Sequence, residues 1–282
     1  MANCRPVLER YRRIFDTCRA YLVASAYGTA HDSERLPEGI EIPSELRFDP
    51  TLLKSGPFLN ILQRLDELTF GPVGMPMPRW VFYDCAEVPG GIFGFARPAA
   101  DIPDWVRRAL DVPSDYDGLV PLSMYVAIPM LEPGAWHTYT LCSLNEVAPG
   151  SAPAGLRLLT EATGLQLFDI QTAWGATQWR SPKLASHTRF GPLDLVTAWT
   201  PAHSDPWTLT FHFPVSRERI DRALASGEPD ASGADIHWVD CDERAELELL
   251  QSQLESGRRF QVVGAPVIDG SYTRVPIREV TP

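Results

Sequence analysis

Apolar residues recur every three or four positions in two stretches near the start of the chain. Residues 5–22 carry the first stretch, with charged residues on the opposite side of a helical projection. Residues 51–69 repeat the pattern, which stops at 71–78, where prolines and glycines forbid a helix. We therefore predict two amphipathic helices, joined over 28–50 by an irregular connection rich in Pro, Gly and Glu.

Beyond residue 78 the pattern becomes typical of β-structure, because β-branched and aromatic residues gather in short runs. Turns containing Pro and Gly separate several of these runs, as in β-hairpins. Two short amphipathic segments, at 104–110 and 154–162, predict helices between them. The predicted strands are 79–86, 91–98, 119–131, 135–144, 165–174, 184–191, 192–200 and 207–215.

The last part of the chain mixes both kinds of element. Helices are predicted at 216–224 and 242–257, separated by a polar Gly/Ser/Pro/Asp linker over 225–235. Two short strands close the sequence. The fold class we predict is α+β: an antiparallel β-barrel or bent double sheet with N-terminal helices and a small αβ C-terminal segment.

The same pattern suggests how the chain is organised. We expect residues 1–70 to supply helices that pack on the sheet, and residues 71–215 to form the antiparallel β core. Residues 216–282 would then be an αβ segment of the same domain, because the length suits one large domain or two modest ones.

The net charge of the chain limits the classes of partner that we expect. The chain has 282 residues and a formal net charge of −11, which argues against binding to nucleic acid or to an anionic membrane. The N-terminal residues become charged at once, and no run approaches about 18 apolar residues, so we expect a cytoplasmic protein without a membrane span. Among 25 basic residues only Lys54 and Lys183 are lysine.

Cysteine and histidine give no metal motif. The five cysteines are far apart and contain no CxxC pair, and the six histidines show no HxH, HxxH or HExxH spacing. We therefore expect idle thiols, no metal and no cofactor.

Residues 172–183 contain the best candidate for recognition. Two indoles, an amide and two cations fall between predicted strands, and such groups can bind a carboxylate or a peptide. The alternative is a surface turn whose tryptophans cover the end of a barrel. The predicted ligand-binding set adds groups from the neighbouring strand and loop, and consists of Trp174, Gln178, Trp179, Arg180, His187, Arg189 and His203.

The loop 200–208 contributes His203 to this set. His203, Ser204 and Asp205 are consecutive, so their side chains diverge and cannot form a catalytic triad with one another. An Asp-Pro turn is the simpler interpretation, although loops at sheet rims often carry binding groups.

A second loop, 145–156, opens a predicted helix and superficially resembles the pyrophosphate loop of acyl-CoA-binding proteins. Pro149 and Pro153 remove two of the N–H donors that such a loop needs. The customary Arg or Gln with spaced glycines is also absent, so an acetyltransferase is not our expectation.

The order of the strands resembles the acetoacetate decarboxylase-like superfamily over roughly residues 60–215. The resemblance lies in 79–103, in SLNE at 143–146 where the family shows Gly-Arg-Glu, and in the three runs that begin at 165, 184 and 192. It implies a β-barrel-like fold and, in the family, a Schiff-base lysine soon after the glutamate. Glu146 matches that glutamate, but 147–155 contain no lysine, and Lys183 is the remaining candidate.

These observations leave three functional hypotheses. We favour a non-catalytic binding protein whose cavity or sheet edge holds a small organic ligand or short peptide. Such a protein would suit an accessory role in a biosynthetic pathway, and a homo-oligomer is compatible with this role. The alternative is a decarboxylase-like or aldolase-like enzyme that acts on a carbonyl metabolite through Lys183 and Glu146. A third hypothesis is a hydrolase that uses His203.

Overall fold

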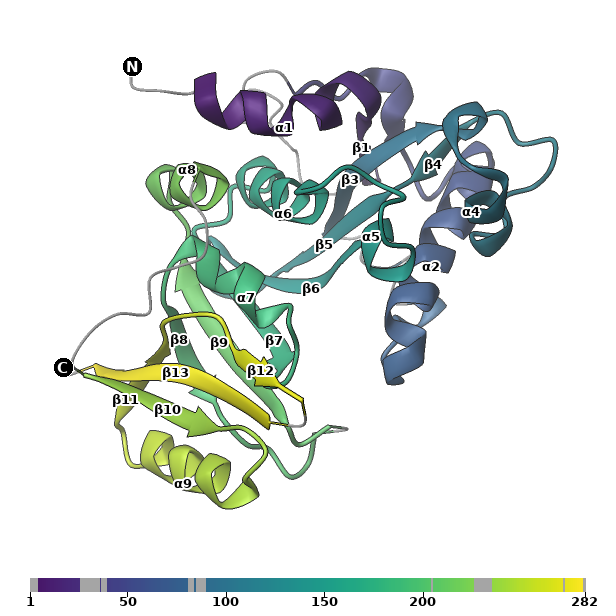
Figure 1. Ribbon diagram of the computed structural model, residues 1–282. Helices are drawn as coiled ribbons and strands as arrows, with labels where there is room; N and C mark the ends of the chain where they lie inside the picture. Colours follow the sequence, from purple (N-terminus) through teal and green to yellow (C-terminus); the bar gives the residue numbers. More distant parts are fainter. Residues whose placement is uncertain are drawn as a thin grey trace. The chain divides into compact units, whose positions relative to one another are not determined.

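The chain forms two compact units, residues 1–170 and 171–282 (Figure 1). The structure is a computed structural model. It describes residues 5–25, 36, 40–80, 84, 90–203, 205–225, 235–270 and 272–280, and side chains from residue 9 onward. Within these residues, no helix combines the length and the apolar character that crossing a bilayer requires.

The first unit is built on an open sheet. The strand order is β2-β1-β3-β5-β6, with β4 also pairing with β3, and every pair is antiparallel except β1 with β2. The strands are β1 (Arg19–Val23), β2 (Arg47–Phe48), β3 (Gly91–Pro98), β4 (Leu119–Pro121), β5 (Ser123–Pro129) and β6 (Ala135–Ser143). Consecutive residues of β3 and β5 are buried, so both faces of this sheet are covered.

Helices cover this sheet. Helix α6 packs against β3, β5 and β6, while α2 packs against β4 and β6. The α-helices are α1 (Arg5–Thr17), α2 (Gly56–Phe70), α4 (Asp104–Ala109), α5 (Leu144–Val147) and α6 (Leu156–Leu167). Short 3-10 helices occur at η2 (Ser44–Leu46), η3 (Leu53–Ser55), η4 (Gly71–Val73) and η5 (Ala99–Asp101).

Local sequence explains the limits of α2. Pro57 stands in its first turn, where the missing N–H costs nothing, and Gly74 ends the following 3-10 turn with a φ of 72°. Asp66, fully buried in α2, accepts a hydrogen bond of 2.6 Å from the Met77 N–H and so fixes the chain after the helix. The Tyr21 ring packs edge-on against Phe58 of α2, with ring centroids 4.9 Å apart.

The second unit is built on another antiparallel sheet, in the order β7-β9-β8-β11-β13-β10, with β12 also pairing with β13. The strands are β7 (Thr172–Gln178), β8 (Leu193–Thr197), β9 (Thr208–Pro214), β10 (Ile236–Asp240), β11 (Arg259–Val262), β12 (Val267–Asp269) and β13 (Tyr272–Val280). Its helices are α7 (Leu184–His187), η6 (Thr188–Phe190), α8 (Arg217–Ala225) and α9 (Arg244–Glu255).

Burial alternates along the strands of this second sheet. In β9, Leu209, Phe211 and Phe213 are buried, whereas Thr210 and His212 between them are half-buried. The buried face meets α7 and η6, where the Phe190 ring stacks on Phe213 at 5.8 Å. The half-buried side chains therefore lie on the opposite face, which we call the open face.

The predicted α+β class is confirmed, with antiparallel pairing throughout most of the sheet structure. The strands form open sheets rather than a closed barrel, since the strand order ends in edge strands.

Several local predictions need correction. Residues 165–167 end helix α6 and residues 184–190 form α7 and η6, where strands were predicted. In the second segment the buried residues Leu184, His187 and Phe190 recur at helical spacing, so packing overrides its β-propensity. The first predicted helix ends at Thr17, and β1 follows. Strand β10 was not predicted.

Two further predictions fall mostly outside the described residues. In the predicted strand 79–86, only Arg79, Trp80 and Asp84 are described, and they are helical. Most of the linker 225–235 is not described.

Candidate functional site

The structure separates the two predicted tryptophans. Trp179 is fully buried, and its Nε1 donates a hydrogen bond of 2.8 Å to the Ala198 carbonyl, so it belongs to the core. Arg180 next to it is exposed, forms an ion pair with Asp242 and lies over the Trp207 ring, 5.1 Å from its centroid. The buried Trp179 side chain therefore offers no surface to a rim with Trp174.

Gln178 and His203 meet at the loop 200–208, through Asp205. The Asp205 carboxylate accepts hydrogen bonds from Gln178 Nε2 at 2.5 Å and from the Trp207 N–H at 3.0 Å. The Asp205 N–H donates to His203 Nδ1 at 3.1 Å, so this loop is held together by its own side chains. Ser204 lies outside the described residues.

Lys183, His187 and Arg189 lie in or beside the short helices α7 and η6. Lys183 is half-buried, and its backbone N–H donates to Ser181 Oγ at 3.2 Å. His187 is buried, with its ring centroid 5.3 Å from that of Phe211, and Arg189 is half-buried. His187 therefore packs against the covered face of the sheet. Glu146 belongs to the other unit, where it pairs with Arg157 at 3.2 Å.

Trp174 leads to a different group of residues. On strand β7 it stands directly opposite His212 of β9, and the two ring centroids are 4.7 Å apart. His212 in turn stands opposite Asp194 of β8, with 3.9 Å between His212 Nδ1 and Asp194 Oδ2. That separation is too long for a hydrogen bond, so the two side chains are neighbours without a direct bond.

The row continues across two more strands. Gln261 of β11 stands opposite Asp194, and its Nε2 donates to Asp194 Oδ1 at 2.9 Å. Arg278 of β13 stands opposite Gln261 and donates to Gln261 Oε1 at 2.9 Å. We call this set the polar row: Trp174, His212, Asp194, Gln261 and Arg278, five directly opposed residues on the open face of five neighbouring strands.

The polar row is partly exposed and incompletely bonded. The side chains of His212 and Asp194 are 34% and 38% exposed. The indole Nε1 of Trp174 is shielded from solvent and has no hydrogen-bond acceptor among the described residues. An indole nitrogen can only donate, so an unpaired shielded N–H is unfavourable by roughly 1–3 kcal/mol in proteins.

Sequence reasoning identified Trp174 but missed the rest of the row. The other four residues come from strands that lie 20 to 104 positions further along the chain, and only the pairing registers bring them together. One signal was available: Asp194, His212 and Gln261 are each a polar residue between two apolar residues of a strand, a pattern typical of a sheet face that is not covered. Arg278, which is followed by Glu279, lacks even this signal.

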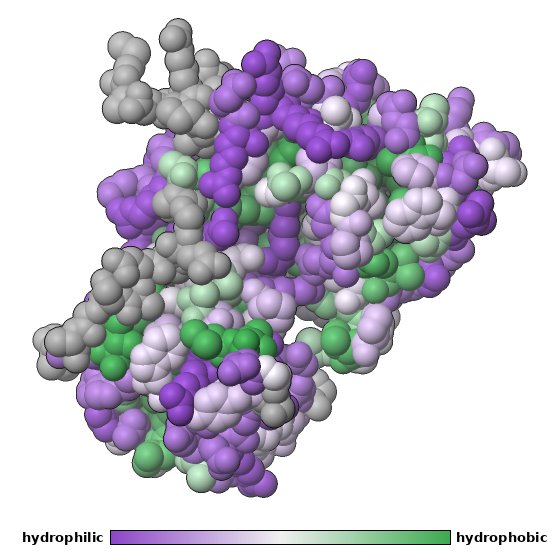
Figure 2. Space-filling view, in the orientation of Figure 1, coloured by the Kyte–Doolittle hydropathy of each residue, from purple (hydrophilic) through white to green (hydrophobic). Residues whose placement is uncertain are grey.

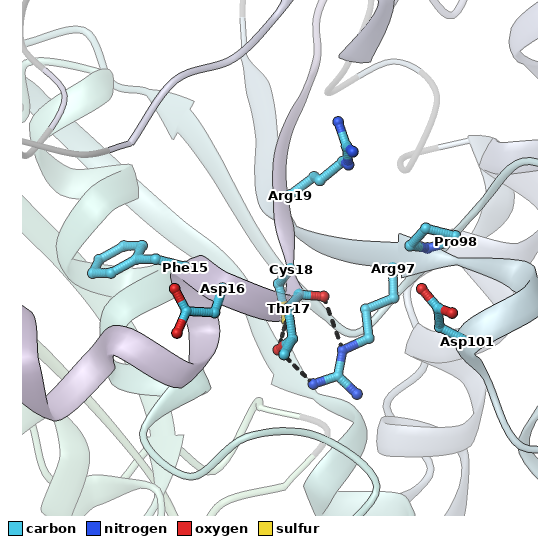
Figure 3. A pocket seen from close by; sticks show the side chains of 8 residues that line it. All are labelled: Phe15, Asp16, Thr17, Cys18, Arg19, Arg97, Pro98 and Asp101. Carbon is cyan, nitrogen blue, oxygen red and sulfur yellow. Dashed lines mark hydrogen bonds between the residues drawn. The ribbon is translucent and has the colours of Figure 1, made fainter.

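The first unit contains a hollow of about 520 Å³ between the end of α1, the start of β1 and the end of β3 (Figure 3). Arg97 donates hydrogen bonds to the Thr17 carbonyl at 3.1 Å and to Thr17 Oγ1 at 2.7 Å, and so ties α1 to β3. Arg19 points away from Arg97 in Figure 3. The charged side chains that line this hollow do not converge on one point, and the role of Arg97 is to hold α1 against β3.

Hydrogen bonds within the loop before α6 also use its polar groups. Asn145 Oδ1 accepts a hydrogen bond from the Ala152 N–H at 3.0 Å, and Asn145 Nδ2 donates to the Ala152 carbonyl at 2.9 Å. A Cβ placed on Gly155 would lie 2.8 Å from the Tyr11 ring, so that ring occupies the start of α6. The arrangement offers no free cradle for a pyrophosphate.

Metal ligands do not cluster in the part of the chain that the structure describes, where no group of three or more His, Cys, Asp or Glu residues could hold an ion.

Comparisons with known proteins give little support for an assignment. No family model matches the chain, and none of the curated proteins matches it. A solved structure from Klebsiella pneumoniae, described as a "putative acyl-CoA N-acyltransferase", is similar with 14% identity. The similarity covers 58% of this chain and 92% of that chain, and its TM-score of 0.30 is too low to support an argument.

The predicted resemblance to the acetoacetate decarboxylase-like superfamily is wrong. No family model supports it. The structure also removes its basis, because two of the three runs that suggested it, at 165 and 184, begin in helices, and the sheets are open.

Proposed function

We propose that the chain binds a small organic ligand on the open face of the second unit, at the polar row, without covalent catalysis. The observation that carries the proposal is the Trp174 indole N–H, which is shielded and unpaired beside a half-exposed His212. A ligand oxygen that accepts this N–H would relieve the cost of leaving it unpaired.

The rest of the row supports the same interpretation. Arg278, Gln261 and Asp194 form a chain of hydrogen bonds that holds the Asp194 carboxylate beside His212. His212 itself stands on a strand whose backbone is paired on both sides. Such preorganised polar groups next to an aromatic ring are typical of ligand sites.

The ligand class follows from the donors. Trp174 can only donate, and His212 can donate through Nε2, so the end of the row at β7 fits a carbonyl or carboxylate oxygen. The indole ring offers apolar contact beside that oxygen. Because the Trp174 nitrogen is shielded, binding requires a small turn of this side chain toward the ligand.

The row contains no serine, threonine, cysteine or lysine, and Asp194, its one carboxylate, accepts a hydrogen bond from Gln261. This is why we propose binding rather than covalent catalysis at this face.

The proposal is tested with N-benzoylglycine, which has a carboxylate, an amide carbonyl and a phenyl ring. We expect a saturable change of one indole ¹H–¹⁵N resonance, identified as that of Trp174 by its loss in Trp174→Phe. Trp105→Phe, at an exposed tryptophan of the first unit, is the matched control and should bind normally.

Benzylamine, which has the ring but no oxygen, should leave the Trp174 resonance unchanged. The proposal would be contradicted if N-benzoylglycine left that resonance unmoved, or if Trp174→Phe bound it as tightly as the natural sequence.

A further inference from the structure

Strand β10 ends the strand order of the second sheet. Among the described residues it pairs with β13 alone, in an antiparallel register that sets Trp238 opposite Pro276. An edge strand with unpaired backbone groups can accept another strand. The direction in which those groups point therefore decides whether β10 can do so.

The backbone of β13 settles that direction. The Val263 N–H donates to the Pro276 carbonyl at 3.0 Å, so the backbone groups of Pro276 point toward the β11 side. Trp238 and Pro276 are then a non-hydrogen-bonded pair, and the N–H and C=O of Trp238 point away from β13. By the same alternation, the backbone groups of Ile236 also point outward.

At the C-terminal end of β10, the outward backbone N–H already has a hydrogen-bond acceptor. The Asp240 N–H, which has the same parity as Trp238, donates to Glu246 Oε2 of α9 at 2.7 Å. Only the stretch Ile236–Trp238 therefore offers outward backbone groups, which suits a short strand.

The side chains beside this edge are apolar and exposed. Trp238 is 47% exposed, Val267 of β12 is 54% exposed, and Tyr272 of β13 is 39% exposed. The registers place all three on the open face. Figure 2 shows hydrophobic surface near β12 among hydrophilic surroundings. Trp and Tyr are the residues most often found at the centre of protein interfaces.

Charge indicates the kind of partner. Arg274 and Arg278 are exposed on the open face, on either side of Pro276, and their hydrogen-bond acceptors are the neutral Tyr272 Oη and Gln261 Oε1. Asp240 on this face is largely buried, and Asp269 is exposed. Two guanidinium groups whose hydrogen-bond acceptors are neutral favour a partner that brings carboxylates to this face.

We propose that an extended acidic peptide segment of a partner protein adds as a strand to Ile236–Trp238, with an apolar side chain against Trp238 and carboxylates near Arg274 and Arg278. Backbone pairing supplies affinity, and the indole with its flanking cations supplies specificity. The peptide site shares Arg278 with the polar row, but Trp238 and Arg274, the residues that its test changes, are not part of that row.

The test uses the whole chain and a fluorescently labelled probe, acetyl-Glu-Val-Leu-Val-Glu-amide, whose two glutamates and leucine share one face of a strand. We expect saturable binding by fluorescence anisotropy, weakened at least tenfold in Trp238→Ala. Trp105→Ala, at a tryptophan of similar exposure in the first unit, should bind normally. Arg274→Gln should weaken binding and reduce its dependence on salt, because Gln cannot carry the charge.

Two altered probes separate the alternatives. The same peptide with lysines in place of the glutamates, and the glutamate peptide with N-methyl groups on its bonding amides, should each bind at least tenfold more weakly. Equal binding of the lysine peptide would overturn the acidic partner, and equal binding of the N-methyl peptide would overturn strand addition.

Two other occupants would also overturn the proposal. The first is a second copy of the chain: sedimentation would show that two copies associate, Trp238→Ala would abolish the association, and the peptide would not bind. The other is binding to phosphatidylserine vesicles in place of the peptide. Circular dichroism of each variant shows that it is folded, and Arg222→Gln on α8 controls for the loss of one exposed positive charge.

Discussion

The two sheets of this protein have opposite burial patterns. In the first unit, successive residues of β3 and β5 are buried, so both faces of the sheet are covered. In the second unit, β8 and β9 alternate between buried and half-buried residues, so one face is open. A covered sheet can only support the fold, whereas an open face can also bind. The difference explains why recognition is best sought in the second unit.

The largest predicted effect tests the burial difference itself. Ile92→Ala and Phe93→Ala change neighbouring, fully buried residues of β3, and each should lower the free energy of unfolding by about 2–5 kcal/mol. In β9, Phe211→Ala should cost as much, but His212→Ala should cost less than about 1 kcal/mol because its side chain is half-exposed. Urea denaturation of the four variants measures these free energies of unfolding. A small effect of either β3 substitution would contradict the conclusion that both faces of the first sheet are covered.

A second, smaller effect compares two tryptophans of the same unit. Trp179→Phe removes the donor to the Ala198 carbonyl and should lower the free energy of unfolding by about 1–3 kcal/mol. Trp174→Phe removes an N–H that has no acceptor among the described residues, and should be neutral or slightly stabilising.

The same denaturation experiments decide this comparison. If both substitutions were equally destabilising, Trp174 would have a structural partner, and the observation behind the proposed ligand site would fail.

A third prediction concerns Lys183, the residue of the enzyme alternative. Lys183→Ala should leave N-benzoylglycine affinity within about twofold, because a half-buried residue outside the row has little effect on it. Borohydride treatment in the presence of acetoacetate should give no adduct on Lys183 by mass spectrometry. A reduced adduct there would instead support an enzyme that forms a Schiff base.

The smallest predicted effect is a change in the pKa of a carboxyl group on the surface of the second unit. Hydrogen bonds from Arg258 lower the pKa of the exposed Glu279 carboxyl; slight desolvation opposes this effect and the Arg258 charge adds to it, both less strongly. A lowered folded pKa means that the pair stabilises the protein above the unfolded pKa of about 4.3, and that this stability is lost as the pH falls through the folded pKa. In Arg258→Gln the Glu279 pKa, followed by NMR, should rise; an unchanged pKa would show that the pair is not formed in solution.

Sequence patterns predicted most elements whose period was clear. Helix α2, the hairpin of β5 and β6, and strand β9 fall within or close to the ranges expected from apolar spacing. The failures are short apolar runs such as 184–191, where a strand and a buried helix show similar composition. In that run the contacts of Phe190 with Phe213 favour the helical turn, and such contacts are not visible in the sequence.

The candidate site was less predictable than the fold. A cluster of tryptophans, an amide and cations within 172–183 is adjacent in sequence, but successive strand residues point to opposite faces, which sends Trp174 and Trp179 to different environments. The residues that do meet Trp174 come from separate strands. Their meeting depends on the strand order β7-β9-β8-β11-β13, which hydrophobic periodicity alone does not specify.

The central claim is that the open face of the second unit is the ligand site. Titration of N-benzoylglycine into the ¹⁵N-labelled protein tests it most directly, because the indole N–H resonances report on both units. The account predicts a saturable shift of the Trp174 resonance that is absent in Trp174→Phe. A shift confined to the tryptophans of the first unit, Trp80, Trp105 or Trp136, would contradict it.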